Sequence, residues 1–396
     1  MAAKYQLITE LYRRTGVTVT KNPQAWQGFL SSACRNYKCR FDEQLLIYAQ
    51  RPDAVAVAKL ETWNRQFKRW VNKDSKGIAV FDPKGRRNTL KYYFDVSDTH
   101  EGYYGSRPVP IWQMDERYEQ AVMERLSDRF GDVESTDLAS ALMETAKNAV
   151  EDNLQDYFSQ LKDCTKDSFL EELDDFNIEV IYRRLAANSV AFMLISRCGL
   201  DTNEFFDRED FADIVNFNTP ATINAIGVAT SDIAEMALRE ISQSIRNVQM
   251  AEKDRIAPLH KERRLSMIKT DNNPKGANTM SEITYSRQGD YLIPDLTLPT
   301  EPELPLGRYA LMHRDYLEKH KRVTYLNLLT SGRLNGHLHE VEQTALQRLE
   351  LLTKQLSAEQ GVTEELKEKA PMQWVGLMNN IRSQAEEVIL TELIYK

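Results

Sequence analysis

The sequence predicts a mainly α-helical protein with a small α+β head. Apolar residues recur at the i, i+3, i+4 spacing of packed helices over most of the 396 residues. Between residues 69 and 95 this spacing gives way to three short strand-like runs separated by turn-forming residues. From Leu306 onward the helical spacing returns. We therefore expect amino-terminal helices with a three-stranded meander, an acidic helical middle and an all-α carboxy-terminal domain.

The length and composition are those of an ordinary globular protein. Apolar residues make up 42% and charged residues 28% of a chain too long for one typical domain. No apolar run approaches the roughly 18 residues of a membrane span, and the first line contains no signal-peptide core. The four cysteines form no metal-binding spacing and suit a reducing compartment. We expect a cytoplasmic protein that makes no membrane contact.

The basic part of the chain lies near its amino terminus. Residues 21–98 carry 15 Lys and Arg against 8 Asp and Glu, whereas residues 99–275 carry 20 against 33. Helices are predicted over 26–37, over 41–51 with an end before Pro52, and over 59–67. The strands of the meander are expected near 69–72, 77–82 and 89–95. This charge asymmetry indicates an anion-binding head on an acidic body.

The head combines cationic turns with aromatic residues. Single-stranded nucleic acid needs both, because its backbone attracts positive charge and its unpaired bases stack on flat apolar faces. The alternative stays open that the aromatic residues are core packing and that the basic turns are ordinary solvated hairpins. The candidate DNA-binding residues of the head are Lys73, Lys76, Lys84, Arg86, Arg87, Trp63, Trp70, Tyr92 and Tyr93.

Several stretches of the head resemble the amino-terminal domain of ArdC-type antirestriction proteins. They are WQGFL, FDEQLLIYAQRPDA (41–54), Trp63 and VNKDSKGIAVFDP (71–83). The resemblance implies binding of single-stranded DNA. Asp74 stands where the family's turn typically has Gly, and since Asp tolerates a left-handed backbone, we expect the turn to persist. Residues 20–250 also resemble the first part of large proteins of conjugative elements, which continue into helicase and methyltransferase modules.

The middle of the chain predicts packed helices whose remaining faces are acidic. The run EELDDF (171–176) is interpreted as a solvated face and not as a metal or acid-base cluster. Such a body confines DNA to the basic head by repulsion, or mimics DNA for a DNA-binding partner, and both interpretations stay open. Residues 263–279, rich in Asn, Pro, Gly and Lys and without apolar period, are predicted to be a linker.

No motif gives a positive reason to expect an enzyme. The sequence has no G-x-x-x-x-G-K-[ST] loop for a nucleoside triphosphate. The nearest string to the zinc motif H-E-x-x-H is HEVEQ (339–343), in which Gln343 replaces the second ligand. His337 and His339 are therefore expected on a helix surface. We predict no catalytic residue, no metal and no cofactor.

The last part of the chain predicts a helical domain. Two short helices are expected over 308–320 and 322–332, followed by a coiled-coil-like stripe from Leu338 to Leu356 and a helix that begins near Pro371. The stretches MSEITYSRQGDYLIPDL, PELPLGRY, EQGVTEEL and MNNIRSQAEEVILTELIY make residues 280–396 similar to the transposon-encoded TnpV proteins. The resemblance implies that two reading frames were joined, with Met280 as a former initiator.

TnpV-like proteins accompany large serine recombinases, so the resemblance implies transposon-end DNA and a serine recombinase as partners of the tail. A cationic cluster on the two short helices is the candidate DNA contact, although a solvated helical hairpin explains it equally well. The apolar stripe also makes the carboxy-terminal helices a candidate for homo-oligomer formation. The tail residues are Arg308, Arg314, Lys319, Lys321 and Arg322.

The sequence thus predicts four segments and a non-catalytic accessory protein of a mobile element, whose first partner is single-stranded DNA. The alternatives are a protein-interaction module acting on a recombinase or restriction system, and an inactive truncated fusion remnant. The segments are a DNA-binding head (1–98), an acidic helical region (99–262), a linker (263–279) and a TnpV-like domain (280–396).

Overall fold

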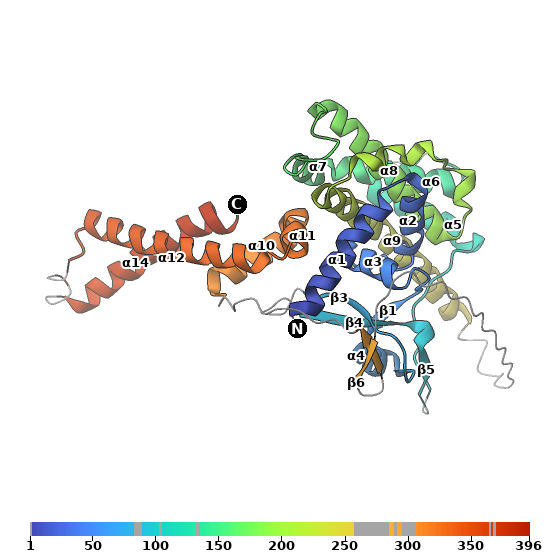
Figure 1. Cartoon of the computed structure of the whole chain (residues 1–396), viewed down its shortest axis with the longest axis horizontal. Helices are drawn as coiled ribbons and strands as arrows, with labels where there is room; N and C mark the ends of the chain where they lie inside the picture. Colours follow the sequence, from blue (N-terminus) through green and yellow to red (C-terminus); the bar gives the residue numbers. More distant parts are fainter. Residues whose placement is uncertain are drawn as a thin grey trace. The chain divides into compact units, whose positions relative to one another are not determined.

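The computed structural model describes residues 2–82, 89–102, 105–131, 133, 135–256, 285–288, 291–294, 306–363, 366 and 370–396. The chain forms two compact units. The first holds the helices and strands up to Ile256, and the second holds the helices from Arg308 onward (Figure 1). The predicted linker 263–279 and Met280 lie outside the described residues. The mainly helical fold with a small antiparallel sheet confirms the predicted fold class.

Three amino-terminal helices open the first unit: α1 (Ala2–Val19), α2 (Pro23–Ala33) and α3 (Phe41–Gln50). Two of them, α1 and α3, lie between strand β3 (Ile78–Asp82) and the helix α9 (Pro220–Ile256) of a larger bundle, whereas α2 packs on α8 (Asp175–Cys198) of that bundle (Figure 1). Helix α2 begins where Asn22 accepts a hydrogen bond from the Ala25 N–H at 2.9 Å. Helix α3 ends before Pro52, as the sequence predicts.

The acidic middle region folds into the bundle. Its long helix α8 packs against α6 and α9. Part of the acidic content is structural, because the carboxylates of Asp115, Asp137 and Asp174 cap helices. The helices are α5 (Glu116–Phe130), α6 (Leu138–Asp152), α7 (Leu154–Lys162), α8 (Asp175–Cys198) and α9 (Pro220–Ile256), and short 3-10 turns η3 (Thr202–Glu204) and η4 (Glu209–Asn216) join the last two.

The amino-terminal helices and the bundle share one core. The Trp26 indole donates to Ser189 Oγ of α8 at 2.9 Å. The Tyr12 hydroxyl donates to Asn224 Oδ1 of α9 at 2.6 Å. Trp26 is fully buried, which confirms that it is a packing residue. The predicted boundary after residue 98 therefore lies inside one compact unit.

The strands form two small sheets. The three-stranded sheet has the order β1-β4-β3, from β1 (Val57–Lys59), β4 (Thr89–Asp95) and β3 (Ile78–Asp82). The predicted first strand of the meander, β2 (Arg69–Val71), pairs instead with β5 (Thr99–Glu101), with Trp70 opposite His100. Lys68, with φ of 55°, turns the chain immediately before β2. The predicted short helix ahead of β2 is observed as α4 (Leu60–Thr62) and a π-helical turn η1 (Trp63–Phe67).

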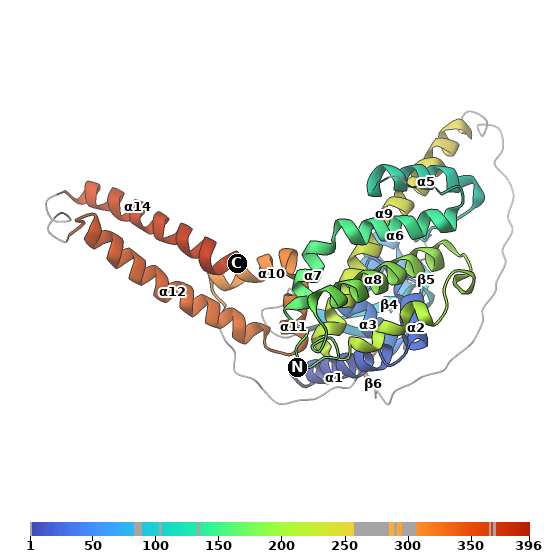
Figure 2. The same cartoon turned by 90° about the horizontal axis from the view of Figure 1, so that it is seen from above.

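The second unit is all-helical. In it, α12 and α14 lie side by side (Figure 2), and α14 begins at Pro371 as predicted. The stripe along α12 packs within the chain, since Ala345 and Leu349 join a core with Tyr309 and Ile389. The helices are α10 (Arg308–His320), α11 (Arg322–Thr330), α12 (Leu334–Glu359) and α14 (Pro371–Ile389), and a π-helical turn η6 (Leu390–Ile394) follows.

A short ladder, β6 (Tyr285–Gln288) with β7 (Tyr291–Pro294), precedes these helices in the sequence. Its strands are antiparallel, with Tyr285 opposite Pro294.

Candidate nucleic-acid interface

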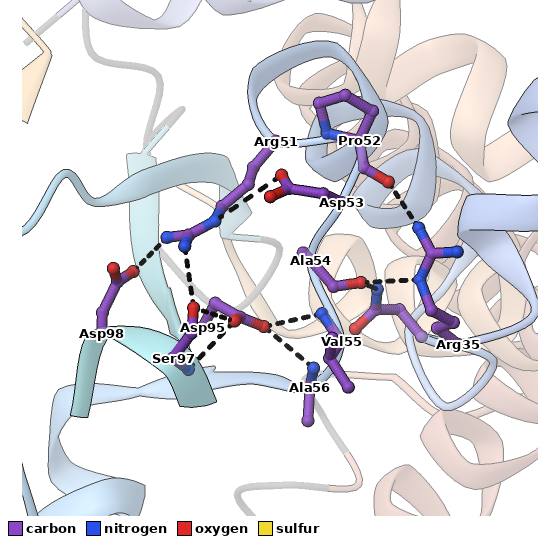
Figure 3. A network of polar contacts seen from close by, with 11 residues as sticks. Arg35, Arg51, Pro52, Asp53, Ala54, Val55, Ala56, Asp95, Ser97 and Asp98 are labelled. Carbon is purple, nitrogen blue, oxygen red and sulfur yellow. Dashed lines mark hydrogen bonds and ion pairs between the residues drawn. The ribbon is translucent and has the colours of Figure 1, made fainter. Parts of the chain in front are cut away.

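A polar network fixes the loop that follows α3 against the end of β4 (Figure 3). The buried carboxylate of Asp95 accepts hydrogen bonds from the N–H groups of Val55 and Ala56, at 2.8 and 2.9 Å, and from the N–H and hydroxyl of Ser97. Arg51 forms an ion pair with Asp98, in the 3-10 turn η2 (Val96–Asp98) that leads into β5. Arg51 of the RPDA stretch (51–54) thus ties the end of α3 to the turn that leads into β5 of the β2–β5 ribbon.

Trp70 projects from this ribbon with 50% of its surface exposed. It lies over Gly102, where an added Cβ would be 2.9 Å from the indole Nε1. The next residue of β2, Val71, points to the opposite face and packs with Trp63 and Phe94 in a small core. The ribbon therefore presents one flat aromatic side chain to solvent on a backbone anchored from behind.

Lysines lie at both ends of β2. Lys68 precedes the strand, Lys73 and Lys76 follow it, and all three are exposed. Asp74 adopts φ of 64°, which confirms that Asp takes the left-handed position in this turn. His100, opposite Trp70, is hydrogen-bonded through Nδ1 to Asn72 Oδ1 at 2.7 Å. The other predicted turn cations, Lys84, Arg86 and Arg87, lie outside the described residues.

Trp63 is a core residue and not a stacking platform. Only 1% of its surface is exposed, and its indole N–H donates to the Phe94 carbonyl at 2.9 Å. No face of the ring is open to a base, and this burial does not fit the predicted DNA contact of Trp63. The π-helical turn η1, which periodicity does not reveal, directs the ring inward.

Tyr92 and Tyr93 are half-buried. Tyr92 packs against the same small core as Trp63. The Tyr93 hydroxyl donates to Glu43 Oε1 at 3.1 Å, and Lys91 pairs with the same carboxylate at 2.5 Å. Burial and then the charge of Glu43 raise the pKa of Tyr93, so this hydroxyl stays protonated. Both rings are held by the fold, which leaves Trp70 as the open aromatic among the four candidates.

The predicted cations of the tail have a mixed environment. Arg308 is exposed and lies 3.4 Å from Glu386, whereas Arg314 is mostly buried beside Asp315 at 3.8 Å. Lys319 is exposed, and Lys321 and Arg322 are half-buried at the junction of α10 and α11. Helix α11, which follows that junction, buries five of its nine residues. Little of that helix is free to enter a DNA groove.

His337 departs from its predicted surface position. Its Nε2 lies 3.2 Å from Nε2 of His313, a buried residue whose Nδ1 is 2.8 Å from the Ile394 carbonyl oxygen. Burial, and then the nearby His313, lower the pKa of His337. Sequence spacing alone does not pair the two histidines, because they lie on different helices, α10 and α12.

In the part of the chain that the structure describes, no three His, Cys, Asp or Glu side chains are grouped so as to hold a metal ion. None of its helices combines the length and apolar composition that a bilayer crossing requires.

Comparison with known proteins gives one assignment. No curated protein and no solved structure gives a significant match to the chain. The ArdC-type resemblance of the amino-terminal region remains an interpretation of its motifs. Residues 284–394 match the model of the family described as transposon-encoded protein TnpV, so the carboxy-terminal part of this chain is a TnpV-like domain.

Proposed function

We propose that this chain is a non-catalytic accessory protein of a mobile element, which binds single-stranded DNA through the β2–β5 ribbon. The transposon-associated family match of residues 284–394 supports the mobile-element context. The exposed indole of Trp70 is the observation that carries the binding proposal.

The chemistry of the ribbon favours unpaired bases. An exposed indole provides the apolar face on which a base stacks, and such a contact contributes about 1–3 kcal/mol. Lys68, Lys73 and Lys76 lie in the segments flanking the same strand, where they can neutralise phosphates of the backbone on either side of the stacked base. In a duplex the base faces are already stacked, so duplex DNA would engage the lysines without engaging Trp70.

The tail receives weaker support as a duplex-binding element. Arg308 and Arg314 already lie beside carboxylates, and α11 is largely buried. We therefore assign transposon-end DNA no role in the main proposal.

The test is an affinity measurement with the full-length chain and a fluorescent oligothymidine. Trp70→Ala should weaken binding about 5- to 150-fold, the equivalent of about 1–3 kcal/mol, while duplex affinity changes little. Phe176→Ala, which removes another exposed aromatic ring, is the matched control and should leave the affinity unchanged. If Trp70→Ala binds the oligothymidine as tightly as the wild type does, the proposal is wrong, and the protein-interaction alternative is then favoured.

A further inference from the structure

A second exposed apolar surface lies on the acidic bundle. Its residues are distant in the sequence from those of the β2–β5 ribbon. Phe176 and Val180, one helical turn apart on α8, are 74% and 46% exposed. Phe169 is 62% exposed and Val215, in η4, is 38% exposed. Large exposed phenylalanines are unfavourable in water and mark interaction sites when they gather in one region.

Two contacts place the segments that carry these residues near one another. Arg184, one turn beyond Val180 on α8, pairs with Asp213 of η4, two residues before Val215. The N–H of Phe169 donates to Asn218 Oδ1 at 3.0 Å, directly after η4. We call Phe169, Phe176, Val180 and Val215 the acidic aromatic patch.

The surroundings of the patch are acidic on balance. Residues 162–184 contain seven Asp and Glu against two Lys and two Arg, and residues 207–215 contain four Asp and Glu against one Arg. Some of these carboxylates have structural partners: Asp174 caps α8, and Asp175 pairs with Lys162. Asp163 and Glu172 are exposed and have no cationic partner among the described residues.

We infer that the acidic aromatic patch docks a basic amphipathic helix of a partner protein. The phenylalanines offer apolar anchors, and the carboxylates attract flanking lysines or arginines and steer the encounter. Phe176 and Val180, spaced one turn apart, suit apolar side chains that recur every three or four residues on a helix. Nucleic acid is disfavoured because its phosphates would face the carboxylates, and a second copy of the patch would be repelled for the same reason. This inference is independent of DNA binding by Trp70.

The test uses the full-length chain and a fluorescent synthetic helix with leucines on one face and lysines on the other. Fluorescence anisotropy should show binding that weakens at least about tenfold in the double variant Phe169→Ala/Phe176→Ala, which keeps every charge. Both rings are largely exposed, so circular dichroism should show an unchanged fold. Trp70→Ala is the matched control and should bind the helix with wild-type affinity. A negative result in this test therefore leaves the DNA-binding proposal standing, and the reverse also holds.

Two comparisons separate apolar docking from simple charge attraction. A helix of serine and lysine with equal charge should bind at least about tenfold more weakly than the leucine helix. The variant Glu172→Lys should bind the leucine helix more weakly than the wild type does, and its affinity should depend less on salt concentration. The inference is overturned if the double phenylalanine variant binds like the wild type, or if the serine helix binds equally well. It is also overturned if the patch variants abolish a concentration-dependent dimer in sedimentation, because the occupant is then a second copy.

Discussion

The ring of Phe41 lies against the backbone of Gly227, so closely that a Cβ atom added to the glycine would be 2.2 Å from the ring. Phe41 cannot retreat, since it is buried and meets the rings of Phe29 and Tyr12 at centroid distances of 5.7 and 6.4 Å. This contact joins α3, one of the amino-terminal helices, to α9 of the bundle. It explains why a helix-disfavouring residue occupies the interior of α9.

Replacing Gly227 by Ala should destabilise the first unit by about 1–3 kcal/mol, because overpacking outweighs the better helix propensity of alanine. Urea unfolding of the full-length chain gives the change. Gly336→Ala in α12 is the control, since no atom lies within 4 Å of the added Cβ, and it should be neutral or slightly stabilising. Equal stability of the two variants would show that the Phe41 contact is looser than described.

Asp95→Ala should destabilise the first unit by about 3–5 kcal/mol, because it leaves the amide groups of Val55 and Ala56 without their acceptor. Asp95→Asn should cost less, since the amide oxygen still serves two donors while its NH₂ group faces the Ser97 N–H. Thermal unfolding monitored by circular dichroism ranks the variants. An alanine variant as stable as the asparagine variant would contradict the role given to the network.

The double variant Lys73→Gln/Lys76→Gln should make single-stranded DNA binding less dependent on salt. Each phosphate contact contributes about 0.7 to the slope of log affinity against log salt, so the slope should fall by about 1.4 in magnitude. Titrations at several salt concentrations measure it. Lys147→Gln, an exposed lysine on α6, is the control and should leave the slope as it was. If both variants keep the wild-type slope, these turn lysines do not contact phosphate.

The second unit should lose stability as the pH falls through the range below about 6.5, the usual pKa of histidine. The pKa of His337 is lowered in the folded state, so the unfolded chain binds more protons in that window and its population rises. His337→Gln should reduce the difference between unfolding midpoints measured at pH 7.5 and pH 5.5. His320→Gln, an exposed histidine on α10, serves as the control. If His337→Gln leaves the difference between the two midpoints unchanged, other titratable groups cause the pH dependence.

Sequence patterns predicted those features that depend on local chemistry. Pro371 marks the start of α14, and Asp74 takes the left-handed turn. The partner of β2 escaped prediction because β5 is three residues long, THE, and too short to show alternation. Trp63 and Trp70 were indistinguishable because periodicity reveals neither the π-helical turn that carries Trp63 nor the positive φ of Lys68 ahead of Trp70.

The hydrogen bond between Tyr12 and Asn224 joins residues 212 positions apart in the chain. At a synthesis rate of about 5–20 residues per second, the ribosome needs on the order of 10–40 seconds to supply the partner of the first helix. During that time the apolar faces of α1, α2 and α3 have no bundle to cover them, and contacts of such long range also slow folding. We therefore expect the emerging chain to expose these apolar faces until α9 is complete.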